Sequence, residues 1–163
     1  MKRLVDYREF VDESEISRIY RKGSRLSKFH ILHINSTYYG GGVAEIMRNM
    51  TPLLNEIGVD VGWRAMIGTR DFFNVTKKFH NALQGEEVEV SDQEKEIYER
   101  ISQEFSKFTH VDHDLVIVHD PQPLPLITYY SKHPPWIWRC HVDLSSPDGG
   151  VWDYLTSFVL AYD

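Results

Sequence analysis

The sequence Phe29-His-Ile-Leu-His-Ile-Asn-Ser-Thr-Tyr-Tyr-Gly-Gly-Gly-Val-Ala-Glu45 contains the strongest structural signal in the chain. Its first six residues, Phe29 to Ile34, form a short apolar run with β-branched side chains, which is typical of a buried strand. Three glycines follow, and a helical pattern begins directly after them. The sequence therefore predicts a unit of strand, glycine loop and helix.

The loop Gly40-Gly41-Gly42 is suited to binding a ligand. Glycine has no Cβ atom, so backbone N–H groups in such a loop can approach a ligand closely. The helix that follows would add unpaired N–H groups and the positive end of its dipole, which favour an anion or a ring of hydroxyls. The alternative is that the glycines only permit a tight turn, although three in succession exceed what one turn needs.

Length and composition indicate one folded domain. The chain has 163 residues, of which 42% are hydrophobic, enough to bury a core. Its formal net charge of −6 argues against a general nucleic-acid surface. The sequence holds neither a membrane-length apolar stretch nor a signal-peptide core, and its only cysteine, Cys140, fits a reducing compartment. We therefore expect a cytoplasmic protein without nucleic-acid or membrane partners.

Hydrophobic periodicity predicts strands and helices in alternation along the rest of the chain. Further strands are expected over 59–67, 114–119 and 135–142. Helices are expected over 43–57, 72–83, 91–108 and 123–130, with a last one that starts near 146–148 and reaches Tyr162. Pro52 is expected to kink the first of these helices. Ser91 and Glu94 form a capping box that marks the start of the third.

This alternation, with continuous apolar strands, indicates an α/β fold with a doubly wound parallel sheet. The domain covers residues 29–163, and residues 1–28 precede it as a polar extension with one or two short helices. The chain ends at Asp163 inside a helical pattern with no closing strand. We therefore expect a domain that is truncated at its C-terminus.

Three polar features follow predicted strands and should meet at one edge of the sheet. They are the glycine loop after Ile34, the pair His119-Asp120, and His141 with Asp143. Ligands of open parallel sheets bind at this carboxyl edge. Asp120 alone would fit a helix cap or a turn, and His141 alone would fit a structural histidine. Their convergence favours a binding site.

Several familiar sites are excluded by the motifs. The dinucleotide fingerprint fails at Glu45, and neither a P-loop nor a zinc motif is present. The run Asp112-His113-Asp114 precedes a strand, so it should lie at the wrong edge to hold a metal ion. Cys140 and His141 should point to opposite faces and cannot pair. Cys140, Trp136 and Trp138 are expected in the core, although aromatic rings near a sheet edge also stack on sugars.

Three motifs together resemble the N-terminal domain of trehalose synthases of the glycosyltransferring type. These motifs are the segments 33–45, 119–124 and 136–147, and the resemblance extends from about Val5 to Asp163. That family belongs to the retaining, nucleotide-sugar-dependent glycosyltransferases with two facing Rossmann-like domains, the GT-B fold. The resemblance therefore implies a Rossmann-like domain that binds the acceptor sugar.

The resemblance also implies a reaction and roles for individual residues. The enzyme would join the glucose of a nucleoside diphosphate glucose to free glucose, giving α,α-trehalose. Catalytic roles would fall on Asp120, which contacts sugar hydroxyls, and on His141, which lies under the transferred glucose. Substrate binding would fall on Gly40, Gly41 and Gly42 and, more weakly, on Arg139. Retaining transfer needs positioning and charge stabilisation more than a strong base, so no metal is expected.

The chain departs from the family in one large respect. Family members carry a C-terminal domain with the Arg and Lys that grip the diphosphate, and this chain lacks it. We therefore expect little or no turnover by the chain alone, with that domain and the two sugars as its partners. Two alternatives stay open, a noncatalytic sugar-binding or assembly module and a GT-B transferase with another acceptor. The nucleotide of the donor and the oligomeric state, including a homodimer, are also open.

Overall fold

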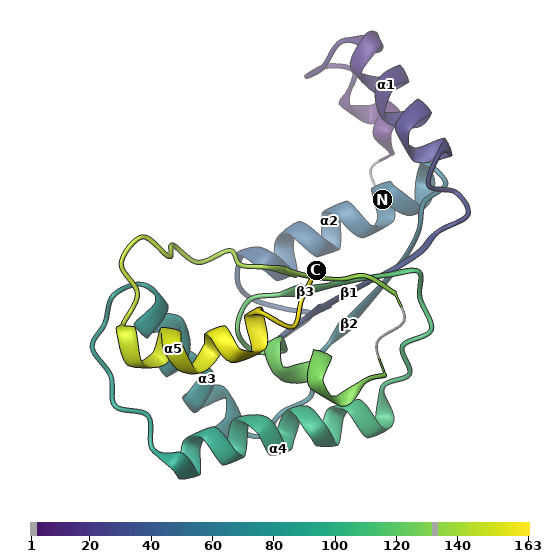
Figure 1. Cartoon of the computed structure of the whole chain (residues 1–163). Helices are drawn as coiled ribbons and strands as arrows, with labels where there is room; N and C mark the ends of the chain where they lie inside the picture. Colours follow the sequence, from purple (N-terminus) through teal and green to yellow (C-terminus); the bar gives the residue numbers. More distant parts are fainter. Residues whose placement is uncertain (1–2, 132–133) are drawn as a thin grey trace.

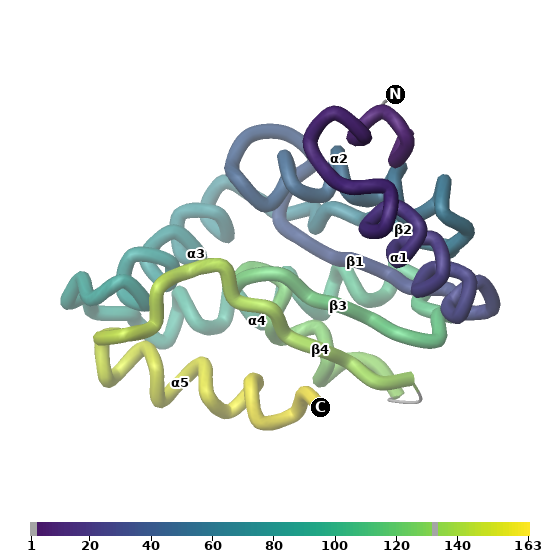
Figure 2. The backbone as a smooth tube through the Cα atoms, turned by 90° about the horizontal axis from the view of Figure 1, so that it is seen from above, coloured from purple at the N-terminus to yellow at the C-terminus, as the bar shows by residue number. Residues whose placement is uncertain are grey.

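Four parallel strands form a single sheet in the order β2-β1-β3-β4 (Figures 1 and 2). The computed structural model describes residues 3–131 and 134–163. The strands are β1 (His30–Asn35), β2 (Asp60–Ala65), β3 (Leu115–His119) and β4 (Trp136–Arg139). Each of the four lies within one or two residues of a predicted strand at its start. The expected α/β fold with a Rossmann-like parallel sheet is confirmed.

Helices alternate with the strands as the periodicity predicts. They are η1 (Leu4–Tyr7), α1 (Glu13–Ser24), α2 (Gly42–Glu56), α3 (Arg70–Leu83), α4 (Asp92–Phe108), η2 (Leu124–Tyr129) and α5 (Gly149–Val159). The helix expected over 123–130 is a 3-10 helix with Pro125 near its start. Helix α2 contains Pro52 and is continuous from Gly42 to Glu56. Within the described ranges, no helix is both long and apolar enough to cross a membrane.

The two faces of the sheet are covered by different helices. Helix α2 lies on one side of the sheet and α3, α4 and α5 lie on the other (Figure 1). Successive residues of a strand point to opposite faces, so Leu32 and Ile34 enter the main core with the α3–α5 layer. Ile31 enters a smaller core cluster, against which Leu54 and Ile57 pack from the α2 side. His33 shares the face of Ile31, which places a polar ring beneath α2.

Strand β4 is shorter than the sequence predicts. We expected a strand over 135–142, but it ends at Arg139. The reason is that the N–H of His141 donates to the Asp120 carboxylate instead of to a neighbouring strand. The core position of Trp136 is confirmed at 1% exposure. Trp138 packs against the main core from a partly buried position, and Cys140 is half-buried instead of buried.

The last helix also ends earlier than expected. Helix α5 ends at Val159, so Tyr162 lies beyond it instead of on its apolar face. The final residues turn back to the edge of the sheet beside β4 (Figure 2). The N–H of Asp163 donates to the Trp136 carbonyl, and its carboxylate accepts the N–H of Trp136. These two hydrogen bonds hold the end of the chain against β4, so the helix does not continue to Asp163.

The N-terminal extension packs on the end of α2. Gly23 of α1 lies so close to Ile57 that an added Cβ would stand 2.9 Å from its Cδ1 atom. The N–H of Leu4 and the hydroxyl of Tyr20 both donate to the carboxylate of Glu56. These contacts all involve Glu56 or Ile57, at the C-terminal end of α2. The extension therefore supports α2 from the end opposite the glycine loop.

Replacing Ser91 with alanine should destabilise the chain. Its hydroxyl accepts the N–H of Glu94, and the Glu94 carboxylate accepts the N–H of Ser91 in return, which confirms the predicted capping box. Loss of such a cap costs about 1 kcal/mol. Urea unfolding should show this loss for Ser91→Ala. Ser106→Ala, whose hydroxyl donates to the Gln103 carbonyl inside the same helix, should stay within about 0.5 kcal/mol of the parent chain.

Candidate functional site

A cavity of about 430 Å³ opens at the carboxyl edge of the sheet. It lies where β1 and β3 end and α2 begins, the position at which open parallel sheets bind ligands. It is lined by Asn35, Ser36, Thr37, Gly40, Gly41, Gly42, Val43, Ala44, Ile46, His80, Asp120, Gln122, His141 and Val142. The structure thus brings together the glycine loop, Asp120 and His141, which are far apart in the sequence.

The glycine loop forms one wall of this cavity. Gly41, the residue before α2, has φ 80° and ψ 157°, a conformation that only glycine adopts readily. An added Cβ at any of the three glycines would meet no atom within 4 Å, so the loop is open toward the cavity. The first helical bond of the N-terminus joins the Glu45 N–H to the Gly41 carbonyl. The amides before Glu45 in α2 form no hydrogen bond with any described residue and can serve a ligand.

Asp120 is held in a tight turn after β3. It is the only non-glycine residue in the described part of the chain with a positive φ, 63°. Its Oδ1 accepts the His141 N–H at 2.7 Å, and its carbonyl accepts the indole N–H of Trp138 at 3.0 Å. Its own N–H donates to the Arg139 carbonyl at 3.0 Å. Oδ2 of Asp120 has no hydrogen-bond partner among the described residues, so this oxygen is available to a ligand.

Three histidine rings form a hydrogen-bonded row that ends at the cavity. His33 Nδ1 lies 2.8 Å from His119 Nε2, and His119 Nδ1 lies 2.8 Å from His141 Nε2. His33 is 5% exposed and His119 is 1% exposed, whereas His141 is half-buried and lines the cavity. The row therefore links the cavity to the buried face of the sheet that α2 covers.

The environment keeps these rings neutral at pH 7. Burial, with a smaller contribution from the positive charge of Arg139, lowers the pKa of His33 to about 4. Burial is also the main reason that the pKa of His119 falls to about 3, with the neighbouring histidines and Arg139 adding to it. Burial lowers the pKa of His141 too, although the Asp120 carboxylate opposes this shift. Each neutral ring offers one N–H donor and one nitrogen acceptor.

These pKa values predict that acid weakens the fold. Between about pH 6.5 and pH 4 the unfolded chain binds protons at His33 and His119 that the folded chain does not bind. The free energy of unfolding should therefore fall as the pH drops through this window. At pH 5, one buried histidine of this kind lowers the free energy of unfolding by about 2 kcal/mol relative to its value at pH 7.5. Urea unfolding at pH 7.5 and pH 5 measures it, and equal values would contradict the buried, neutral row.

Other lining residues are not singled out by the sequence patterns. Asn35 accepts the indole N–H of Trp63 and donates to the Thr37 carbonyl, which shapes the start of the glycine loop. His80 reaches the cavity from α3. The buried Oε1 of Gln122 has no hydrogen-bond partner among the described residues. Only Asn35 carried a usable signal, a polar residue directly after an apolar strand.

Arg139 does not line the cavity. It is the last residue of β4, and its side chain is exposed. Its carbonyl accepts the Asp120 N–H, and its charge lowers the pKa of the histidine row. Its expected role in substrate binding stays a prediction.

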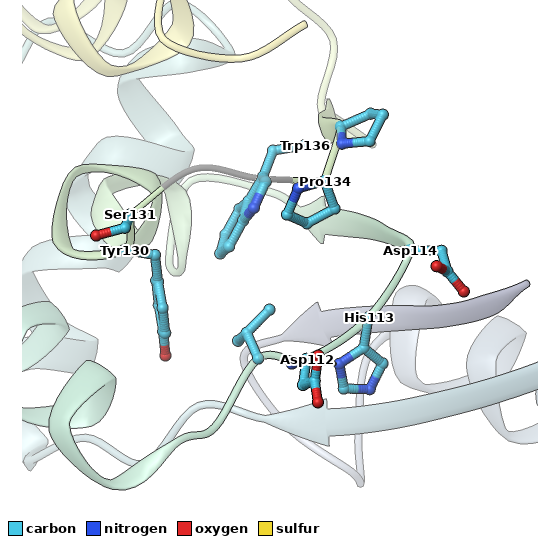
Figure 3. A pocket seen from close by; sticks show the side chains of 9 residues that line it. Asp112, His113, Asp114, Tyr130, Ser131, Pro134 and Trp136 are labelled. Atoms are coloured by element: carbon cyan, nitrogen blue, oxygen red, sulfur yellow. Dashed lines mark hydrogen bonds between the residues drawn. The ribbon is translucent and has the colours of Figure 1, made fainter.

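The run Asp112-His113-Asp114 lies at the opposite edge, as expected. The Asp114 carboxylate accepts the N–H of His30 at the start of β1, and the rings of His113 and His30 lie 4.0 Å apart. This run lines a separate cavity of about 420 Å³ with Tyr130 and Trp136 (Figure 3). Across the described residues, no group of three or more His, Cys, Asp or Glu side chains is arranged to hold a metal ion.

Comparison with known proteins identifies the family. Residues 33–163 match the family model described as trehalose synthase, N-terminal domain. The chain belongs to this family. It is 47% identical over 164 residues to a trehalose synthase of Pyrococcus horikoshii, and 40% identical over 169 residues to one of Rubrobacter xylanophilus. Each alignment covers 99% of this chain and 40% of the relative.

More distant relatives of this trehalose synthase domain are also trehalose enzymes. A trehalose phosphorylase of Pleurotus pulmonarius is 27% identical over 176 residues, which cover 93% of this chain and 24% of that protein. The chain thus spans about two-fifths of the length of the synthases that it resembles. The family model begins at His33, the first member of the histidine row, and includes every residue that lines the cavity.

Proposed function

We propose that this chain is the acceptor-binding half of a retaining GT-B glycosyltransferase that makes α,α-trehalose from a nucleoside diphosphate glucose and glucose. One observation carries the proposal above all. The glycine loop, the free oxygen of Asp120 and the ring of His141 line one cavity at the carboxyl edge of the sheet. Membership in the trehalose synthase family supports the choice of sugars.

The cavity offers hydrogen-bonding groups that match a glucose molecule. The Oδ2 atom of Asp120 would accept a hydrogen bond from an acceptor hydroxyl, as a charged oxygen that can make a strong bond. The ring of His141 would donate or accept one more. The buried Oε1 of Gln122 gives the site a further acceptor. These groups would hold the attacking hydroxyl in place, which is the main requirement of a transfer controlled by positioning.

The start of α2 would serve the donor. Its free amides and the positive end of the helix dipole face the cavity and favour a negatively charged group such as a diphosphate. The open conformation of Gly41 lets the ligand approach the backbone without a side chain in between. A second domain, facing this one, would supply the cationic side chains for the remaining phosphate charge. In this proposal no step requires a metal ion.

Trehalose formation from ADP-glucose or UDP-glucose and glucose tests the proposal. The chain would be assayed alone and mixed with a separately produced C-terminal part of the Pyrococcus horikoshii relative. We expect trehalose only from the mixture. Absence of trehalose in both samples, with the partner shown to be folded and bound to the chain, would contradict the proposal. That result would favour a noncatalytic sugar-binding or assembly module, and a different disaccharide would indicate another acceptor.

A further inference from the structure

The histidine row has a geometry that couples its members. His33 pairs with Ile117 of β3, and His119 lies two residues further along that strand. His119 pairs with Arg139 of β4, and His141 again lies two residues further along the chain. Residues two apart on a strand share a face, so His33 and His119 lie on one face of the sheet. The hydrogen bond between His119 and His141 extends this diagonal line past the end of β4. Each ring is 5.2 or 5.1 Å from the next, centroid to centroid.

Both hydrogen bonds of the row join an Nδ1 atom to an Nε2 atom. A neutral imidazole carries one proton, so it donates through one nitrogen and accepts through the other. If His141 donates through Nε2, then His119 accepts at Nδ1 and must donate through Nε2 to His33. The reverse arrangement puts every proton on Nδ1. Only these two arrangements make both bonds, and each gives the same tautomer to all three rings.

A mixed arrangement would be costly in this location. It would place two N–H groups, or two unprotonated nitrogens, face to face at 2.8 Å, and two of the three rings, His33 and His119, are buried. An unsatisfied buried polar group costs about 1–3 kcal/mol. A proton added between two facing unprotonated nitrogens would restore that bond, but burial opposes the charge by lowering the pKa of all three rings. The protons of the row therefore move together or not at all.

We propose that His33 and His119 are positioning residues that hold His141 in a shared tautomer and so decide whether its Nδ1 donates or accepts a hydrogen bond in the cavity. Nδ1 is the only ring nitrogen of His141 outside the row. Other charged or titratable groups near His141 are Asp120 and Arg139, and His80 lines the same cavity from α3. None of them forms a hydrogen bond with a ring of the row among the described residues.

This inference rests on the proposed function only for the identity of the ligand, a sugar, that Nδ1 would meet. A row that merely filled the core would make no difference to which hydrogen bond His141 offers. The coupled row makes that choice depend on His33, which does not line the cavity. The test therefore uses the tautomers themselves and no sugar, so its failure is distinct from a failure to form trehalose.

Long-range ¹H–¹⁵N correlation spectra of the ¹⁵N-histidine-labelled chain at pH 7.5 measure the tautomers. The chemical shifts of Nδ1 and Nε2 give the fraction of each tautomer at each ring. We expect the same fraction at His33, His119 and His141. His110, which is exposed and outside the row, should show its own fraction. Unequal fractions at the three coupled rings would overturn the proposal.

Substitution at His33 provides the second arm. His33→Leu removes the end of the row, and we expect the tautomer fraction of His141 to change although residue 33 does not line the cavity. His33→Asn keeps a hydrogen-bonding group near the position of Nδ1 and should leave His141 closer to the parent chain. His110→Asn is the control and should leave His141 unchanged. An unaltered tautomer fraction of His141 in a folded His33→Leu chain would overturn the proposal. If this variant does not fold, the comparison of the three tautomer fractions in the parent chain is the deciding test.

Discussion

Asp120→Asn is expected to abolish most of the trehalose formation of the reconstituted two-part enzyme while leaving the fold nearly unchanged. Asparagine tolerates the left-handed conformation that residue 120 adopts, with φ 63°. Its side-chain oxygen can still accept the His141 N–H. The substitution removes the negative charge and the second carboxylate oxygen. We propose that this oxygen accepts a hydrogen bond from a hydroxyl of the acceptor sugar. A hydrogen bond to a charged group contributes about 1.5–3 kcal/mol, which corresponds to a loss of roughly 10- to 150-fold.

The KM for glucose and kcat of the mixture measure this effect, and urea unfolding of each chain gives the control. Asp120→Ala should lose activity and also stability. It leaves the His141 N–H without the bond at 2.7 Å and forces alanine into a left-handed conformation. Asp120→Gly also lacks the carboxylate, so it should be as inactive as the alanine variant. It should be more stable than that variant, because glycine adopts the left-handed conformation without strain. Wild-type kinetics of Asp120→Asn would show that this carboxylate does not bind the acceptor.

Gly41→Ala is expected to destabilise the chain by about 1–3 kcal/mol, because alanine is strained in the backbone conformation of Gly41. It should also weaken sugar binding, because the loop can relieve this strain only by moving. Gly41 has φ 80° and ψ 157°. The space around it is empty, so any effect arises from the backbone and not from a clash. The same substitution one residue later serves as a matched control. Gly42 is the first residue of α2, its added Cβ also meets nothing, and its φ is not positive.

Urea unfolding of the two variants separates these cases. Gly42→Ala should be as stable as the parent chain or slightly more stable, because alanine favours the helix. A difference between Gly41→Ala and Gly42→Ala of less than about 0.5 kcal/mol would contradict the conformation found at Gly41. Loss of stability in Gly42→Ala alone would instead indicate that α2 begins at a different residue.

Local signals in the sequence were sufficient for most of the fold. The apolar run before the glycines, the capping box at Ser91 and the continuous apolar residues 115–118 each act over a few neighbouring residues, and each lies in the predicted element. The meeting of Gly40–Gly42, Asp120 and His141 could also be predicted. It follows from the rule that parallel strands present their carboxyl ends at one edge.

What the sequence could not supply depends on register and on bonds between distant residues. The histidine row exists because His119 lies two residues beyond the partner of His33, and nothing in a single sequence specifies that pairing. The early end of β4 has a similar cause, since the carboxylate of Asp120 takes the N–H that a longer strand would use. The exposure of the Arg139 side chain could not be predicted either, because Arg139 is the last residue of the shortened strand. Strand alternation alone did not show that β4 would stop there.

Titration of the ¹⁵N-labelled chain with glucose tests most directly whether the cavity at the carboxyl edge binds the acceptor sugar. We expect chemical-shift changes that saturate and that concentrate on Gly40–Gly42, Asp120 and His141. Asp120→Asn should weaken them by at least roughly 10-fold in affinity. Changes confined to the opposite edge, around His113 and Trp136, or unaltered affinity in Asp120→Asn, would show that the acceptor sugar does not bind in this cavity.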